Sequence, residues 1–220
     1  MLQNKTRSRY ERGNAFIFIL LGIALFAGLA FTISRSMRSQ TTTTLSSRDA
    51  DLAATDIMSY NQALSRAVDR VRRKGCSEND ISFEQDNVTG YEHGSAVPDK
   101  CKIFHPDGGN VTWQASPVEN RNYEFWGNND VQGIGASPAS ELIVALPLAA
   151  GHTEVCSQYN KKAGAGATIA TGGDDEDETK FTGGFGDSLT SITETPGRAT
   201  ACFDADGSGS YIIYSVLLQR

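Results

Sequence analysis

Residues 14–33, NAFIFILLGIALFAGLAFTI, decide how this chain is organised. They contain no charged side chain. At about 1.5 Å per residue, a helix of this length spans roughly 30 Å, which matches the hydrocarbon core of a bilayer. The segment therefore predicts a transmembrane helix over residues 14–34, or else the apolar part of a signal peptide.

The leader that precedes this segment, residues 1–13, is short and basic. It holds four Lys and Arg residues against one acid, Glu11. By the positive-inside bias such a leader stays in the cytoplasm, although Arg35 and Arg38 on the far side weaken this orientation without reversing it. We therefore expect a single-pass protein of the bacterial inner membrane, with the rest of the chain periplasmic or extracellular.

Three processing outcomes fit the same residues. The span can stay uncleaved as an anchor. A signal peptidase can cut at Gly28-Leu29-Ala30 and release a soluble protein. A prepilin-type peptidase can cut after Gly13, so that the mature chain begins at Asn14.

The third outcome is supported by a resemblance. A basic leader ending in Arg12-Gly13, followed at once by an apolar helix and a stalk, resembles the class III signal of type IV pilins and type II secretion pseudopilins over residues 5–74. Phe18 stands where pilins usually carry a Glu, and Asn14 replaces the usual Phe or Met. In the family, loss of that Glu is associated with a tip position. The resemblance implies a prepilin-type peptidase and other pilin-like subunits as partners.

Small residues form a stripe on the predicted membrane helix. Ala24, Gly28 and Thr32 recur at every fourth position, a spacing that lets another helix approach closely in lipid. Gly and Ala are also common in any membrane helix, and this explanation is slightly preferred.

An amphipathic helix is predicted over residues 49–75, after a Ser/Thr-rich connection at 35–48. Apolar residues recur there at alternating intervals of four and three, which places them on one face of a helix. Gly75 stands where a C-terminal cap belongs. We expect this face to pack on the protein's own sheet. Its members are Ala53, Ile57, Tyr60, Leu64, Ala67 and Val71.

Four cysteines, Cys76, Cys101, Cys156 and Cys202, follow the apolar segment. Their even number in a Gly-rich region predicts two disulfides and an oxidising compartment. None belongs to a C-x-x-C pair, which disfavours a zinc site or a redox dithiol. Cys76 with Cys101 and Cys156 with Cys202 is the simplest of the three connectivities, and the sequence alone does not choose among them.

The head, residues 76–220, has short β-prone runs between turn signals. We interpret it as an antiparallel sheet whose first two strands form a hairpin at Asp107-Gly108. Residues 154–160 predict a short helix. The fold class expected is α+β and pilin-like, with a long N-terminal membrane and stalk helix packed on a small antiparallel β-sheet head. The expected strands are 101–105, 110–114, 122–126, 141–146 and 211–218.

Two acidic segments need separate interpretation. Residues 174–178, DDEDE, lie in a Gly-rich stretch that predicts a long, mobile surface loop. Asp204 and Asp206 belong to an Asp-x-Asp-Gly sequence that resembles part of a calcium loop. No Glu follows at the twelfth position, so a turn is the favoured explanation and Ca²⁺ the alternative. No other cofactor is expected.

Charge divides the chain. Residues 1–74 carry 12 Lys and Arg against 5 Asp and Glu, whereas residues 75–220 carry 8 against 21. A basic N-terminal part suits a lipid bilayer, and an acidic head argues against nucleic acid as a partner.

No catalytic constellation accompanies the three histidines, so we expect a structural subunit of a filament or secretion apparatus rather than an enzyme. The alternative is a periplasmic or surface binding module on an uncleaved anchor. Its site would be an aromatic one for glycan or protein, although core packing is the favoured explanation for these side chains. The residues concerned are Trp113, Tyr123, Phe125 and Trp126.

Overall fold

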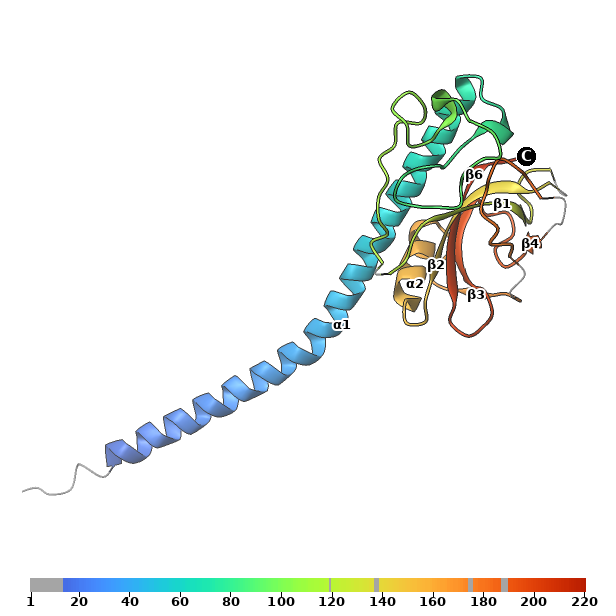
Figure 1. The fold of residues 1–220 in the computed structure, drawn as a ribbon. Coiled ribbons are helices and arrows are strands. Elements are labelled where there is room, and N and C mark those ends of the chain that lie inside the picture. The colour runs from blue at the N-terminus through green and yellow to red at the C-terminus, as the bar shows by residue number, and fades with distance from the viewer. Residues whose placement is uncertain (1–13, 119, 137–138, 174–175, 187–189) are drawn as a thin grey trace, which may run out of the picture. The chain divides into compact units, whose positions relative to one another are not determined.

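The computed structural model of the 220-residue chain describes residues 14–118, 120–136, 139–173, 176–186 and 190–220 (Figure 1). In the first helix, side chains are described at residues 19–23 and from residue 46 onward. The chain forms two compact units, Met1–Arg48 and Asp49–Arg220, and each is considered by itself.

Helix α1 (Asn14–Arg73) contributes its last 25 residues to the second unit. All six residues of the apolar face predicted for residues 49–75 are buried there, which confirms that prediction. The helix ends in a Schellman motif, in which Gly75 N donates to Arg72 O (3.0 Å) and Cys76 N to Val71 O (3.3 Å). Gly75 has a φ of +84°, a conformation that favours glycine, so the expected cap is also confirmed.

Membrane spanning is not supported by the described part of the chain. None of its helices is both long enough and apolar enough to cross a bilayer. The predicted span lies mostly outside the residues whose side chains are described.

The described residues of the head form one sheet of six strands, in the order β3-β5-β6-β2-β1-β4. The four inner strands pair antiparallel, whereas β4 lies parallel to β1 and β3 lies parallel to β5. The strands are β1 (Glu124–Val131), β2 (Glu141–Leu148), β3 (Ala170–Thr171), β4 (Thr190–Ile192), β5 (Thr200–Asp204) and β6 (Tyr211–Leu218).

The expected pilin-like fold, a long membrane and stalk helix on a small antiparallel sheet, is therefore wrong. The sheet is mixed, and no long apolar helix is found among the described residues. The physical reason lies in the Gly-rich stretch of residues 161–190, which we interpreted as a long surface loop. One short edge strand, β3, forms within this stretch and another, β4, begins at its end, and both run parallel to their neighbours. Pairing between segments far apart in the chain leaves no local sequence pattern.

Alternate side chains of each strand point to opposite faces of the sheet, and each face is covered by its own cluster of buried residues. On one face Phe125, Val144 and Ile213 join the apolar face of α1 in the larger core. On the other face Trp126, Ile143 and Tyr214 join a second cluster. This arrangement explains why β2 is an almost continuous apolar run rather than an alternating one.

Two disulfides link the head, Cys76 with Cys101 and Cys156 with Cys202, so the prediction of two disulfides is confirmed and the pairing is sequential. The second bond joins α2 (Thr153–Lys162) to β5. Helix α2 confirms the short helix expected at residues 154–160. Two single-turn 3₁₀ helices, η1 (Glu78–Asp80) and η2 (Asp99–Cys101), flank the first bond.

The expected hairpin over residues 101–114 is not formed. Instead, Ile103 N donates to Ser82 O (2.8 Å), and Ser82 N donates to Cys101 O (3.1 Å). The Cys76–Cys101 bond explains the difference, because it holds residues 76–82 beside residues 101–103. The turn at Asp107-Gly108 returns the chain to residues 102–103, where Gly109 N donates to Lys102 O (2.9 Å).

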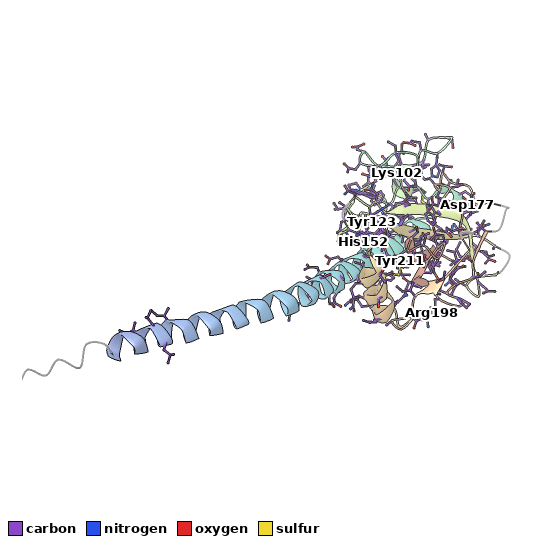
Figure 2. All side chains as sticks on the ribbon, turned by 90° about the horizontal axis from the view of Figure 1, so that it is seen from below. Lys102, Tyr123, His152, Asp177, Arg198 and Tyr211 are labelled. Carbon is purple, nitrogen blue, oxygen red and sulfur yellow. A yellow bond between two sulfur atoms is a disulfide. The ribbon has the colours of Figure 1, made fainter. Side chains whose placement is uncertain are left out.

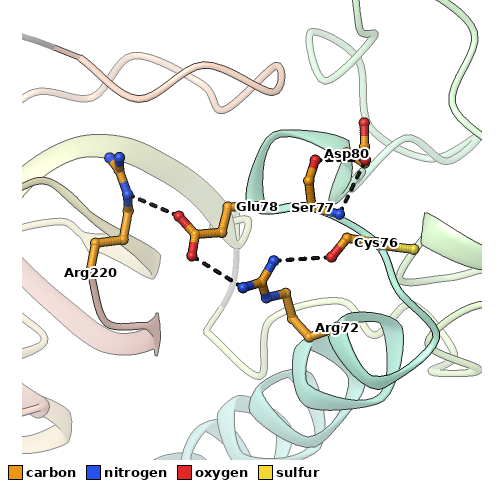
Figure 3. A network of polar contacts seen from close by, with 6 residues as sticks. All are labelled: Arg72, Cys76, Ser77, Glu78, Asp80 and Arg220. Atoms are coloured by element: carbon orange, nitrogen blue, oxygen red, sulfur yellow. Dashed lines mark hydrogen bonds and ion pairs between the residues drawn. The ribbon is translucent and has the colours of Figure 1, made fainter.

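An ion-pair network ties the C-terminal residue to the start of the head (Figure 3). Glu78 accepts from Arg72 Nη2 at 3.2 Å and from Arg220 Nε at 3.1 Å. Arg72 also donates to Cys76 O at 3.0 Å. The end of α1, the first disulfide and the end of the chain are thus held together.

Candidate functional site: a groove on the head

A groove of about 750 Å³ opens between two segments of the head, residues 84–92 and 102–113. Its size falls within the range of about 300–1,000 Å³ that small-molecule sites occupy. Lys102, one of its lining residues, lies on the opposite side of the head from Arg198 (Figure 2).

The groove has two aromatic residues, Phe104 and Trp113, both partly buried. Their rings meet edge to face, with centroids 5.5 Å apart and an angle of 83° between planes. Phe104 rests in turn on Phe83 and Phe125 of the core, and Trp113 on Tyr123. The rings are therefore held by the core.

Polar groups line the groove on the side of residues 84–92. The Gln85 Oε1 atom accepts from the N and the Nδ2 of Asn87, both at 3.0 Å, which fixes the amide's orientation. Gln85 Nε2 is then buried without an acceptor among the described residues. An unpaired buried donor is costly in a folded protein, so this amide is a feature to be explained.

Lys102 lines the groove, and its ammonium group is already bonded to two carboxylates. Its ammonium lies 3.3 Å from Glu84 and 3.5 Å from Asp99. The hydrogen bond to Glu84 is the main cause that raises the pKa of Lys102, with Asp99 adding to it. The remaining carboxylates, Asp86 and Glu92, leave the groove acidic.

The three histidines lie in different surroundings. His105 accepts from Asp107 N at 3.2 Å, as a turn residue does. His152 places Nδ1 3.0 Å from Ala149 O. Burial lowers the pKa of His93, whose Nε2 has no partner among the described residues.

The aromatic site of the binding-module alternative is only partly formed. Tyr123, Phe125 and Trp126 are at most 2 % exposed and belong to the core, as the favoured explanation held. The Trp126 indole donates to Glu124 at 3.0 Å. Of the four residues proposed for this site, Trp113 alone lines the groove. Sequence reasoning missed the groove because its two sides come from segments that the first disulfide brings together.

Most residues singled out at the N-terminus cannot be placed. Gly13 lies outside the described residues. Asn14 begins α1, but its side chain is not described, and the same holds for Ala24, Gly28 and Thr32. Cleavage and helix packing therefore stay predictions.

Asp204 and Asp206 form a turn. Asp204 Oδ1 accepts from Gly207 N and Gly209 N at 3.0 and 3.2 Å, and Asp206 accepts from Ser208 N and Oγ, both at 2.8 Å. The two bonds from Ser208 lower the pKa of Asp206. Across the described residues, no group of three or more side chains is arranged to hold a metal ion.

The acidic segment is anchored to β1 in its described half. Asp177 accepts from Asn128 Nδ2 at 3.0 Å, and its backbone exchanges two 2.8 Å bonds with the Asn129 side chain. The hydrogen bond from Thr179 is the main cause that lowers the pKa of Asp177. The loop expected to be mobile is thus tied to the sheet at this residue, while Asp174 and Asp175 lie outside the described residues.

One carboxyl group is buried away from the groove. Glu141, the first residue of β2, is fully buried, and its Oε2 accepts from Val131 N at 2.8 Å. Its Oε1 has no partner among the described residues. Burial raises the pKa of Glu141 to about 7; the charge on Asp130 adds to this effect, and Arg220 opposes it.

Comparison with known proteins finds no matching family model, no similar curated protein and no similar solved structure.

Proposed function

We propose that this protein is a membrane-anchored structural subunit of a filament or secretion apparatus, of the pilin-like or minor-pseudopilin kind. The observation that carries the proposal is the sequence Arg12-Gly13 directly before the uncharged residues 14–33. The proposal concerns the cleaved leader, the membrane anchor and the structural role. It does not require the head to have the fold of a pilin head.

In this proposal a prepilin-type peptidase cuts after Gly13 and leaves Asn14 as the first residue. The apolar segment holds the subunit in the inner membrane until it assembles with copies of itself or with other pilin-like subunits. Phe18, in place of the family's Glu, favours a position at the tip. Two disulfides support export, because such bonds persist in oxidising compartments. No catalytic role is assigned.

The test is the intact mass and N-terminal peptide of the protein taken from its native membrane fraction. A mature chain beginning at Asn14 is expected, and Gly13→Leu should abolish this cleavage. Gly22→Leu is the matched control, because a Cβ at Gly22 meets nothing within 4 Å and position 22 lies beyond the cleavage site. A chain that begins at Met1 or at Phe31 would contradict the proposal.

A second candidate function is a binding module on an uncleaved anchor, and the groove favours it. A groove with core-held aromatic rings and several polar groups is the usual form of a small-molecule site. The same mass measurement separates the candidates, because this module keeps Met1 and needs no peptidase.

A further inference from the structure

We infer that the groove between residues 84–92 and 102–113 binds an uncharged saccharide. The inference goes beyond the proposed structural role and holds whether or not the N-terminus is cleaved. Three properties of the groove support it: its aromatic rings, its charge, and its mixture of hydrogen-bonding groups.

The aromatic residues match the apolar side of a sugar. A pyranose ring presents C–H groups on its face and hydroxyls around its rim, so it needs a flat apolar partner beside polar ones. Trp113 supplies such a partner, and its indole N–H is a hydrogen-bond donor suited to a hydroxyl oxygen. The packing of Trp113 against Phe104 and Tyr123 holds the indole in place before a ligand arrives.

The charge of the groove excludes anionic ligands. Glu84, Asp86 and Glu92 line it, and the ammonium of Lys102 is already paired with Glu84 and Asp99. A phosphate, a sulfate or a uronic acid would meet a net negative charge from the side chains that line the groove. An uncharged ligand does not meet this repulsion.

The polar groups match the rim of a sugar. Carboxylates only accept hydrogen bonds, whereas the amides of Asn87 and Asn110 both donate and accept, as hydroxyls do.

A peptide fits the groove less well. Extended peptides gain most of their backbone hydrogen bonds by adding to a free sheet edge. Within the described residues, the groove segments carry only isolated bridges, Gln85 with Val88 and Ser82 with Lys102, and none of the six strands lines it. We therefore assign the groove to a saccharide.

The experiment is saturation-transfer difference NMR on the full-length protein with three probes at millimolar concentration: maltotriose, cellotriose and triacetylchitotriose. The protein is kept in a zwitterionic detergent, because maltoside and glucoside detergents would compete. Transfer to ring C–H protons of at least one probe is expected. Trp113→Ala should weaken binding at least tenfold, Trp113→Phe several-fold, and Asp86→Ala several-fold.

Arg198→Ala is the control variant, because Arg198 lies across the head from the groove (Figure 2), and it should bind as the unaltered protein does. Tryptophan fluorescence gives a second measurement. Trp126 is fully buried and bonded to Glu124, so a change on titration reports Trp113, and Trp113→Phe should remove it.

The outcomes decide the inference even if Trp113→Ala fails to fold, because the unaltered protein and Asp86→Ala are measured as well. Transfer to none of the three probes overturns it. If Asp86→Ala and Trp113→Phe both bind the sugar as tightly as the unaltered protein, the inference is overturned too. It is also overturned if the protein binds a basic peptide in the groove and none of the three sugars. None of these results depends on where the N-terminus is cut, so the structural proposal is tested separately.

Discussion

At the scale of single residues, the buried carboxyl of Glu141 makes stability depend on pH. Its pKa is about 7 in the folded protein, above the ordinary value of 4.5. Between these two values the folded protein holds a proton that the unfolded chain has lost. The stabilisation that Glu141 gives by holding this proton is therefore fully present below pH 4.5 and is lost as pH rises through 7.

We expect the free energy of unfolding to fall by roughly 2–3 kcal/mol between pH 5 and pH 8 as a result of this group. Glu141→Gln should flatten the profile, because an amide oxygen can still accept from Val131 N and carries no charge to bury. Guanidinium unfolding at several pH values measures the effect. Glu124→Gln, which alters a carboxyl on the neighbouring strand, should keep the slope. An equal slope in Glu141→Gln would contradict the assignment.

Gly109 is a second residue with a specific physical role. A Cβ at this position would collide with the backbone of Ile103, and backbone atoms cannot rotate away. Gly109→Ala should therefore destabilise the protein by about 2 kcal/mol or more, since overpacking typically costs about 1–3 kcal/mol. Gly94→Ala is the matched control, because a Cβ there meets nothing within 4 Å. Thermal unfolding compares the two, and equal midpoints would show that the turn can open without cost.

At the scale of elements, the second-unit part of α1 stabilises the head through one face. Two leucines of this segment differ sharply in exposure: Leu64 is 0 % exposed and Leu52 is 62 % exposed. Leu64→Ala should cost about 2–5 kcal/mol, and Leu52→Ala should lie within about 0.5 kcal/mol of the unaltered protein. Chemical unfolding of both variants measures the difference. Similar losses at the two positions would mean that the leucines have similar surroundings.

The elements also show what the sequence can predict. The apolar face of α1, strands β2 and β6, and helix α2 have local patterns, and all of them form. Strands β3 and β4 have two and three residues, and their pairing partners lie more than 30 residues away. Such strands form only through tertiary contacts, so no periodicity in the sequence predicts them.

The candidate groove was missed for a related reason. Residues 110–114, NVTWQ, alternate as a strand does, yet in the structure Val111 and Trp113 pack on the larger core from one side of the groove. The sequence did contain one signal, the pair Cys76 and Cys101. A disulfide between them closes a loop that includes residues 84–92 and brings this segment beside residues 102–113. The pairing had to be known before that signal could be used.

At the scale of the whole molecule, the boundary of the second unit lies inside α1. The unit begins at Asp49, upstream of the first disulfide, and the buried residues of α1 belong to the same core as the sheet. A chain that begins at Asp49 therefore keeps this core complete, whereas one that begins at Cys76 leaves a sheet face uncovered.

We expect the chain that begins at Asp49 to unfold cooperatively and to form both disulfides, because every residue of the larger core is retained. The chain that begins at Cys76 should lose cooperative unfolding and bind a hydrophobic dye, since Phe125, Val144 and Ile213 lose the helix that covers them. Calorimetry and dye fluorescence under oxidising conditions compare the two chains. A sharp transition in the shorter one would mean that the sheet and its disulfides suffice, and that α1 only rests on a head already folded.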